Sequence, residues 1–387
     1  MRTLELLKQL IAIPSFVDEK NNEKNIGEFI YQYLKQFSFL TVEKQFITPE
    51  RFNIIAKDKF PTKLLLNGHI DTVQPKTGWL TDQYKSVVKN GKLYGLGASD
   101  MKSNVAAMLS SITNFQETKG LMLLFYIDEE YDFLGTKEFI KIYKNKIKPK
   151  YIISGDGNDL TIGNGCRGLI EISFIAKGLS GHASRPHLGK NAILRSIKAI
   201  NEFTKFIGKN YTTKELGVST CNLAFLEGGL FRGKENNRLV IGREGNNIAD
   251  IAEFVLDIRT ANPKLDANKV TRLIKQFLEN NGLELQESKI RHNANPWITP
   301  KEQLKTIEKY INKTMPITYK NPGDNGYSDM QLMWGAFKKT PTFTFGAGCG
   351  KTCHQVNEYV KVNELEKVTI IYKQFIQELA GGITKTL

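Results

Sequence analysis

The chain has 387 residues, of which 41% are hydrophobic and 24% charged, and its 54 Lys and Arg against 40 Asp and Glu give a net charge of +14. These proportions are typical of a globular protein with two domains and exclude a disordered, collagenous or disulfide-stapled chain. The positive charge could indicate binding to nucleic acid, a membrane surface or anionic small molecules. Alternatively, it could come from lysines spread over solvated faces without a binding role.

Three features of the sequence argue against export and membrane insertion. The most continuous apolar stretch, residues 121–127, is far too short to span a bilayer. The first residues indicate an amphipathic helix, because Glu5 and Lys8 interrupt the leucines, and not a signal peptide. The 4 cysteines do not form a disulfide framework. We therefore expect a cytoplasmic protein that does not bind a membrane.

The first part of the chain alternates helical periodicity with unbroken apolar runs. Helices are predicted over residues 3–11, 22–37, 102–115 and 133–143, and strands over residues 63–67, 121–127 and 151–154. Apolar runs without alternation, separated by helices, are typical of an α/β fold with a mostly parallel sheet and helices on both faces.

The middle of the chain has strands that alternate apolar and polar residues, which indicates a smaller α+β unit with one solvated sheet face. Its predicted elements are strand 169–176, helix 190–207, strands near 218–226 and 251–259, helix 266–281 and strand 283–291. Beyond Pro300 the α/β character returns, with helices 301–314, 329–338 and 362–379 and strand 342–345. We predict a discontinuous domain, residues 1–167 and 295–387, interrupted by an inserted domain, residues 168–294.

Polar residues stand at the ends of the three apolar runs. His69 and Asp71 follow the first run, Glu129 and Glu130 the second, and Asp156 the third. In an open α/β sheet, ligands bind beyond the carboxyl ends of the strands, so these side chains are expected to share one crevice.

Two further residues belong to the same pattern. Asp100 lies in a Gly-rich loop directly before a predicted helix, and His354 follows the strand 342–345. Taken alone, Asp100 could be a helix N-cap and His354 a structural histidine. The joint pattern carries the argument, since the chain has only 5 His.

Histidines and carboxylates in such a set suit divalent metals, most naturally zinc. An Asp in a Gly-flanked loop could bridge two metals, and a Glu that is not a ligand could take the proton from an activated water. The Asp of His69-Ile-Asp71 could hold the other imidazole nitrogen and fix the tautomer.

Four segments carry a resemblance to a known family. They are His69-Ile-Asp71-Thr-Val, Gly97-Ala-Ser-Asp100-Met-Lys, Asp128-Glu129-Glu130 and Ser180-Gly-His182-Ala-Ser-Arg-Pro. In order and spacing they resemble motifs of the di-zinc metallohydrolase family that includes acetylornithine deacetylase and succinyl-diaminopimelate desuccinylase. That family also holds aminoacylases, glutamate carboxypeptidases and dipeptidases.

The resemblance implies two divalent metal ions per subunit, zinc or alternatively cobalt. It implies that His69 and Asp156 hold one ion, that Glu130 and His354 hold the other, and that Asp100 bridges them. Glu129 would be the general base and Asp71 would orient His69. The resemblance also implies a cis peptide bond between Asp100 and Met101.

For the inserted domain the resemblance implies a lid through which two subunits form a homodimer. His182 would reach the partner subunit's active site and stabilise the oxyanion. Asn247 and Arg259 would contact the substrate, Arg259 suiting a carboxylate. Ser328, in Gly326-Tyr-Ser-Asp329, would line the substrate pocket.

The sequence departs from the commonest family pattern at a few positions. Asp156 stands where many deacylases have Glu, Leu96 where many relatives have Arg, and Cys353 precedes the last His. None of these changes removes a ligand, but they leave open the choice between deacylase and dipeptidase.

Other functions fit the sequence less well. The segment Gly346-Ala-Gly-Cys-Gly-Lys-Thr352 is one residue short of a phosphate-binding loop. The scattered lysines come with no nucleic-acid-binding motif, so we expect no nucleic-acid partner. A non-catalytic binding relative is disfavoured by Glu129 and the full ligand set. The sequence therefore predicts a zinc-dependent hydrolase of N-acyl amino acids, or alternatively of dipeptides or other short peptides, acting on small substrates with a free carboxylate.

Overall fold

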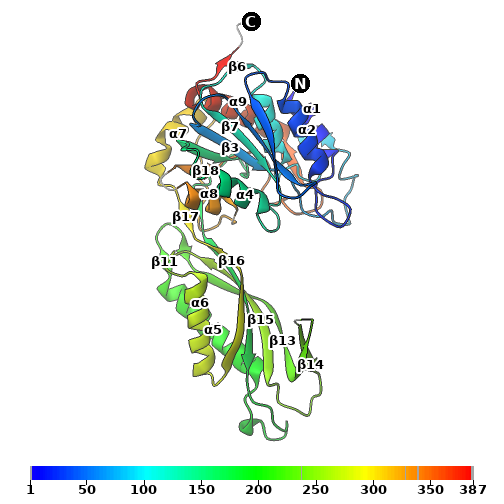
Figure 1. The fold of residues 1–387 in the computed structure, drawn as a ribbon, viewed down its shortest axis with the longest axis vertical. Helices are drawn as coiled ribbons and strands as arrows, with labels where there is room; N and C mark the ends of the chain where they lie inside the picture. Colours follow the sequence, from blue (N-terminus) through cyan, green and yellow to red (C-terminus); the bar gives the residue numbers. More distant parts are fainter. Residues whose placement is uncertain (1, 237, 327, 338–339, 385–387) are drawn as a thin grey trace. The chain divides into compact units, whose positions relative to one another are not determined.

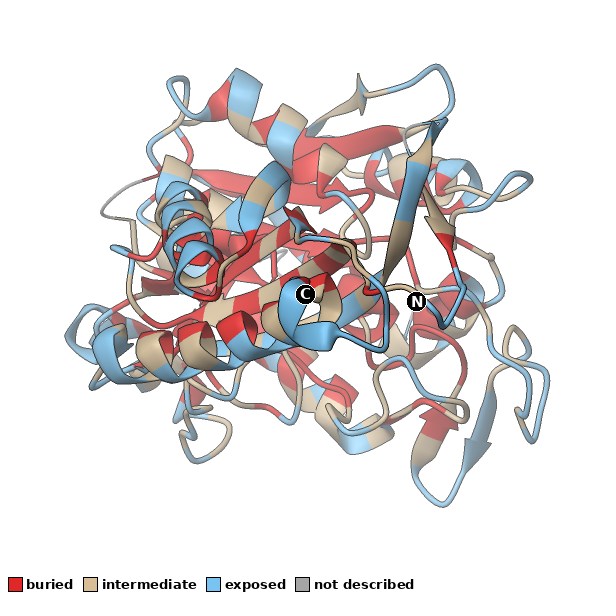
Figure 2. Cartoon of the chain, turned by 90° about the horizontal axis from the view of Figure 1, so that it is seen from below, coloured by how far each residue is buried: buried red, intermediate tan, exposed pale blue. Residues whose placement is uncertain are grey.

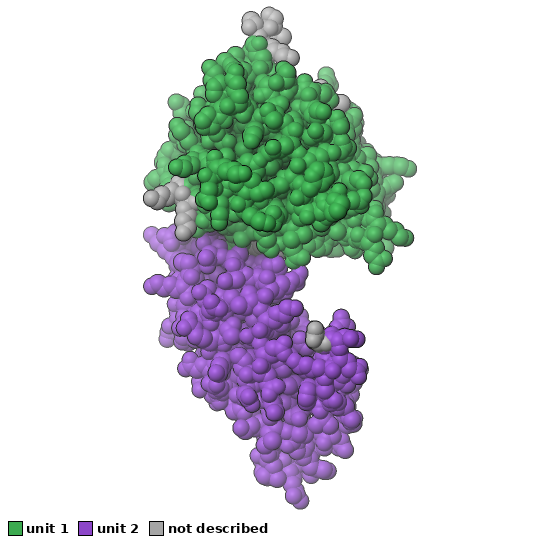
Figure 3. All heavy atoms as spheres, in the orientation of Figure 1, with its two compact units in different colours: residues 1–164, 298–320, 328–387 green, residues 165–297, 321–327 purple. Residues whose placement is uncertain are grey.

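The computed structural model describes residues 2–236, 238–326, 328–337 and 340–384. The chain divides into two compact units, shown in different colours in Figure 3. Unit 1 comprises residues 1–164, 298–320 and 328–387, and unit 2 comprises residues 165–297 and 321–327. The segment 321–327 was predicted to lie in the discontinuous domain. It groups with unit 2, where Asn325 donates a hydrogen bond to the Gly165 carbonyl over 2.8 Å and Gly323 lies close to the Leu216 carbonyl.

Unit 1 is built on a six-stranded sheet, and its strand order is β1-β2-β7-β3-β8-β18. These strands are β1 (Thr41–Phe46), β2 (Phe52–Lys57), β7 (Leu121–Tyr126), β3 (Leu64–His69), β8 (Tyr151–Ser154) and β18 (Thr342–Thr344). The last four in this order run parallel, and β2 and β1 add an antiparallel edge. The three apolar runs are thus neighbouring parallel strands, as expected from their continuous apolar character.

Helices cover both faces of this sheet (Figure 1). They are α1 (Thr3–Ile11), α2 (Lys24–Leu34), α3 (Lys102–Ser111), α4 (Leu134–Tyr143), α7 (Lys305–Ile311), α8 (Met330–Ala336) and α9 (Val362–Leu379). On β2, Gly27 of α2 packs against Phe52 and Ile54, whereas Gly135 of α4 packs against Asn53. Successive strand residues point to opposite faces, so α2 and α4 lie on opposite sides. The predicted fold class is confirmed. The predicted helix 329–338 ends on Lys338, which lies outside the described residues.

Smaller strands complete unit 1. Strands β4 (Val87–Lys89), β5 (Lys92–Tyr94) and β19 (Tyr359–Lys361) form a separate sheet, and β6 (Phe115–Glu117) pairs with β20 (Ile383–Thr384). Figure 2 shows the buried residues concentrated in the strands and along one side of the helices. Of the helices in the described part of the chain, none combines the length and the apolar character needed to cross a membrane.

Unit 2 has a five-stranded antiparallel sheet of order β14-β13-β15-β10-β16. These strands are β14 (Arg238–Gly242), β13 (Thr220–Glu235), β15 (Ile251–Thr260), β10 (Gly168–Lys177) and β16 (Glu284–Ala294). Helices α5 (Ala192–Asn210) and α6 (Ala267–Asn280) lie side by side on one face (Figure 1). Asn191 and Asp266 cap their N-termini with side-chain hydrogen bonds. Short strands are β9 (Gly165–Cys166), β11 (Thr212–Thr213), β12 (Gly217–Val218) and β17 (Trp297–Ile298).

Candidate active site

The site is built at the carboxyl ends of the parallel strands of unit 1. His69 is the last residue of β3, opposite Tyr126 at the end of β7. Glu129 and Glu130 lie in the loop after β7, and Asp156 follows β8, which pairs with β3 in parallel. Because these strand ends meet at one edge of the sheet, the side chains converge as the sequence predicts.

Two sets of candidate metal ligands form there, and Asp100 belongs to both. One set is His69, Asp100 and Asp156, and the other is Asp100, Glu130 and His354, with the donor atoms of each set within 4.8 Å of one another. The Nε2 atom of His69 lies 3.0 Å from Oδ1 of Asp100, and Nε2 of His354 lies 3.2 Å from Oδ2 of the same carboxylate. Each oxygen of Asp100 therefore faces one of the two sets.

Glu129 stands beside these sets. It forms a further group of nearby donors with His69 and Glu130. Burial raises the pKa of Glu129 well above its ordinary value, and the charge of Asp156 adds to the shift. Burial, and after it the charge of Asp100, raises the pKa of Asp156 to about 7. The carboxylates are thus crowded together and partly buried, an arrangement that disfavours their charged forms unless cations are present.

Asp100 is the exception among these carboxylates. Burial would raise its pKa, but hydrogen bonds from His354 and His69 outweigh burial and hold the pKa below its ordinary value. Imidazole nitrogens and carboxylate oxygens are the donors that zinc and similar divalent ions prefer. The donor set and its excess of negative charge therefore fit two divalent ions.

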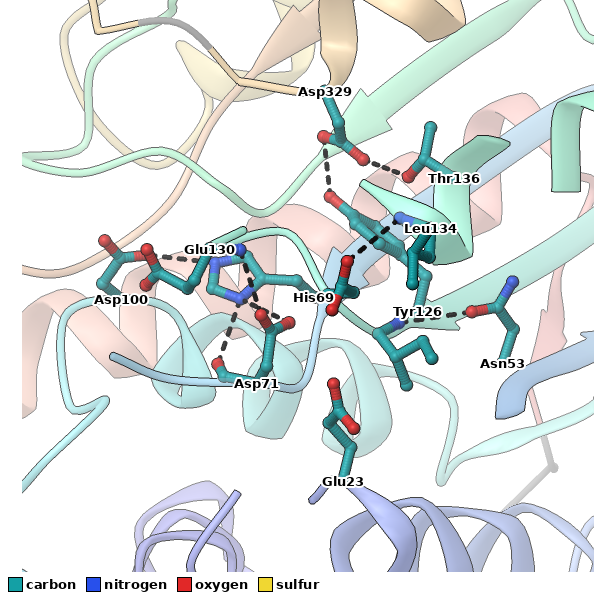
Figure 4. Close-up of polar contacts among 12 residues, drawn as sticks. Glu23, Asn53, His69, Asp71, Asp100, Tyr126, Glu130, Leu134, Thr136 and Asp329 are labelled. Atoms are coloured by element: carbon teal, nitrogen blue, oxygen red, sulfur yellow. Dashed lines mark hydrogen bonds and ion pairs between the residues drawn. The ribbon is translucent and has the colours of Figure 1, made fainter. Parts of the chain in front are cut away.

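Asp71 contacts His69 mainly through its backbone. The Nδ1 atom of His69 lies 3.1 Å from the Asp71 carbonyl oxygen and 3.5 Å from its Oδ1. Figure 4 shows the His69 ring between Asp71 and Asp100. The other carboxylate oxygen, Oδ2, accepts a hydrogen bond from the backbone N–H of Glu130 over 3.0 Å. Asp71 thus fixes the imidazole and the Glu130 backbone together. The peptide bond between Asp100 and Met101 is cis, as the resemblance implies.

Two polar residues that the sequence analysis did not single out hold the loop after β7. Arg51 bonds Glu23 through two nitrogens, at 2.8 and 2.6 Å, and contacts Asp128 at 2.5 Å. Asn53 (Figure 4) accepts a hydrogen bond from the backbone N–H of Ile127 and donates one to the carbonyl of Gly135. The sequence offers one signal for them: Asn53 is the polar residue in the otherwise apolar segment 52–56, and Arg51 directly precedes that segment.

A second buried network lies beside β7. The hydroxyl of Tyr126 donates to Asp329 over 2.9 Å, and the hydroxyl of Thr136 donates to the other oxygen of Asp329 (Figure 4). Asp329 is fully buried, and burial raises its pKa to about 6. Ser328, predicted to line the substrate pocket, precedes Asp329 and is buried. Its neighbour Tyr327 lies outside the described residues.

The remaining predicted site residues belong to unit 2. His182 lies in an exposed loop, where its Nδ1 is 2.7 Å from the hydroxyl of Ser184, and its backbone bridges to that of Asn247. Arg259 lies on β15, and its side chain forms two hydrogen bonds with Asp257, at 2.8 and 3.0 Å. Unit 2 thus brings His182 and Asn247 together.

Comparisons with known proteins agree with this geometry. Residues 65–378 match peptidase family M20/M25/M40. The chain is 27% identical to a succinyl-diaminopimelate desuccinylase of Nautilia profundicola, over 98% of this chain and 100% of the relative. It is 26% identical to an acetylornithine deacetylase of Buchnera aphidicola, over 97% of both chains. The crystal structure of aminopeptidase PepT from Bacillus cereus superposes with a TM-score of 0.76 at 18% identity, covering 98% of each chain.

The family match spans most of the chain, and the ligand-bearing strand ends lie within the matched residues. The resemblance seen in the sequence is thereby confirmed. The chain belongs to peptidase family M20/M25/M40 and is a metal-dependent hydrolase of amide bonds.

Proposed function

We propose that this chain is a two-metal deacylase that cleaves the amide bond of N-acyl amino acids. The observation that carries this proposal is the sharing of Asp100 between two sets of ligands, with Glu129 beside both. Full-length similarity to a desuccinylase and a deacetylase supports the choice of acyl amino acids as substrates.

In this proposal His69 and Asp156 hold one ion, Glu130 and His354 hold the other, and Asp100 binds both. Zinc suits these nitrogen and oxygen donors best, and cobalt is an alternative. When bound, such ions lower the pKa of a water molecule and polarise a carbonyl group. Asp71 keeps His69 in the tautomer that leaves Nε2 free to bind, because the Asp71 carbonyl accepts the proton at Nδ1.

Glu129 acts as general base and then as general acid. Its partly buried carboxylate takes a proton from the attacking water and delivers that proton to the nitrogen of the leaving amine. Glu130 has the adjacent position in sequence but a different partner, since its Oε1 lies 3.1 Å from Nε2 of His354. The doublet therefore divides into one proton carrier and one ligand.

Unit 2 acts as a lid and dimerisation domain in this proposal. His182 stabilises the oxyanion in the partner subunit's active site, and Asn247 and Arg259 contact the substrate. In unit 1, Ser328 lines the substrate pocket. Arg259 is held in one orientation by Asp257, which suits recognition of a carboxylate. The net charge of +14 favours such anionic substrates. A homodimer in the cytoplasm, without nucleic-acid or membrane partners, completes the proposal.

A hydrolysis panel tests the function. Purified protein, loaded with Zn²⁺ or Co²⁺, is assayed with N-acetylornithine, N-succinyl-diaminopimelate, other N-acetyl amino acids and dipeptides. We expect the highest kcat/KM with an N-acyl amino acid, and chelation should abolish turnover. Preference for dipeptides would support the alternative proposal of a peptidase, which is consistent with the structural likeness to an aminopeptidase. No hydrolysis by metal-loaded protein would contradict both.

A further inference from the structure

We propose that Glu358 is a positioning residue that fixes the shared ligand Asp100 relative to His354, and so sets the affinity for both metal ions. This inference rests on the proposed two-metal function. It concerns a residue with no predicted role as a ligand or in proton transfer.

The carboxylate of Glu358 is hydrogen-bonded by the backbone of the loop that carries Asp100. Its Oε1 accepts hydrogen bonds from the backbone N–H groups of Ser99, over 2.7 Å, and Asp100, over 2.9 Å. Its Oε2 accepts one from the N–H of Gly97 over 3.0 Å. The side chain is 1% exposed, so these bonds are shielded from water. Charge-assisted bonds of this kind are stronger than bonds between neutral groups.

The backbone of Glu358 is itself anchored. Its carbonyl accepts a hydrogen bond from the N–H of Gly95 over 3.1 Å, and β19, which begins at the next residue, pairs with β5. Gly97 has a φ of 78°, and a Cβ there would lie 2.9 Å from Cγ2 of Thr72. The loop is therefore confined on one side by Thr72 and bonded to Glu358 through its backbone, which leaves Asp100 little freedom.

Ser99 provides a second link to the same C-terminal segment. Its hydroxyl donates to the carbonyl of Tyr359 over 2.7 Å and accepts a bond from the N–H of Cys349 over 2.8 Å. His354 lies in the sequence between Cys349 and Glu358. The segment that carries His354 is thus tied at both ends to the loop that carries Asp100.

These ties have a consequence for metal binding. Asp100 and His354 are about 250 residues apart in sequence, yet the second ligand set requires both at fixed positions. Outer residues that orient metal ligands commonly change metal affinity by about 10–100-fold when they are mutated. An amide at position 358 would turn an N–H group toward at least one backbone N–H donor, so Gln cannot replace Glu in this arrangement.

The test measures metal binding to chelator-stripped protein by calorimetry, with Co²⁺ absorption spectra as a second readout. We expect Glu358→Gln to weaken binding by about tenfold or more and to alter the Co²⁺ spectrum. Neither readout depends on turnover.

Asp58→Asn is the matched control. Asp58 is also a buried carboxylate of unit 1, and it accepts backbone hydrogen bonds from Phe60, Gly120 and Leu121. Leu121 begins β7, whereas the ligands follow the other end of that strand. Both variants should lower thermal stability, but the control should leave metal affinity within about twofold of wild type.

The outcomes separate the two proposals. Wild-type protein that binds fewer than two ions per chain would overturn the proposed function. Wild-type protein with two ions, together with unchanged affinity in Glu358→Gln or equal losses in both variants, would overturn only the role of Glu358. If Glu358→Gln does not fold, Ser99→Ala breaks the second link more gently. Normal metal affinity in Ser99→Ala would then refute the positioning of Asp100 by this segment.

Discussion

The loops that carry the predicted functional residues differ between the two units. In unit 1 the loop with Asp100 is held by Glu358, and the loop with Glu129 and Glu130 is held by Arg51, in both cases through buried hydrogen bonds. In unit 2 the loop with His182 is exposed from residue 182 to residue 188. There His182 contacts the nearby hydroxyl of Ser184.

This difference fits two different tasks. Metal ligands must be placed to within a fraction of an ångström before the ion arrives, which requires supporting residues with fixed side chains. A residue that contacts the substrate can lie on a more exposed loop, because binding can order it. The comparison therefore predicts that substitutions of the residues that support the ligand-bearing loops of unit 1 affect folding or metal binding. Substitutions in the His182 loop are expected to affect turnover alone.

The largest effect on turnover is expected from Glu129→Gln. The variant keeps the size of the side chain but cannot carry the proton, so kcat should fall by about 10²–10⁴-fold. Metal content, measured by mass spectrometry of the purified protein, should stay at two ions per chain. Near-normal turnover would show that another group is the base.

Arg51→Met tests the support of the loop after β7. It leaves the buried carboxylates of Glu23 and Asp128 without their partner, and removing one member of a buried ion pair typically costs about 3–5 kcal/mol. We expect a loss of this size in urea denaturation. The matched control is Arg232→Met in unit 2, where Arg232 pairs with Glu244 at the surface and about 1 kcal/mol or less is expected. Equal losses of unfolding free energy in the two variants would contradict the view that buried side chains hold the loops more firmly in unit 1 than in unit 2.

The central strands and the candidate ligands of unit 1 could be predicted from the sequence for a physical reason. Buried parallel strands are continuous apolar runs, and the polar residues that end them must lie at the sheet edge, so His69, Glu130 and Asp156 could be placed without coordinates. Strong amphipathic periodicity likewise gave helix 362–379 the bounds that α9 has.

Other features could not be predicted because they depend on contacts between distant segments. Strand β1 is partly exposed along its whole length and offers no apolar run, so it was missed. Glu358 and Asn53 bond the backbone of segments far away in sequence, and Arg51 bonds the side chains of Glu23 and Asp128. Nothing in the local sequence of these three residues indicates their partners. Residues 321–326 group with unit 2, where Asn325 bonds the Gly165 carbonyl and Gly323 lies against Leu216, contacts that composition does not reveal.

His182→Ala is expected to have the smallest effect on the fold and tests the other side of the comparison. Its side chain is exposed, so unfolding free energy should change by about 0.5 kcal/mol or less. Loss of an oxyanion donor should nevertheless lower kcat by about 10²-fold, with metal content unchanged.

Mixing His182→Ala with Glu129→Gln subunits provides the decisive control. If His182 serves the partner's site, a heterodimer restores one active site with an intact Glu129 and a donated His182, and activity should rise above that of either variant alone. Activity that stays at the sum of the two variants would show that His182 serves its own subunit or none.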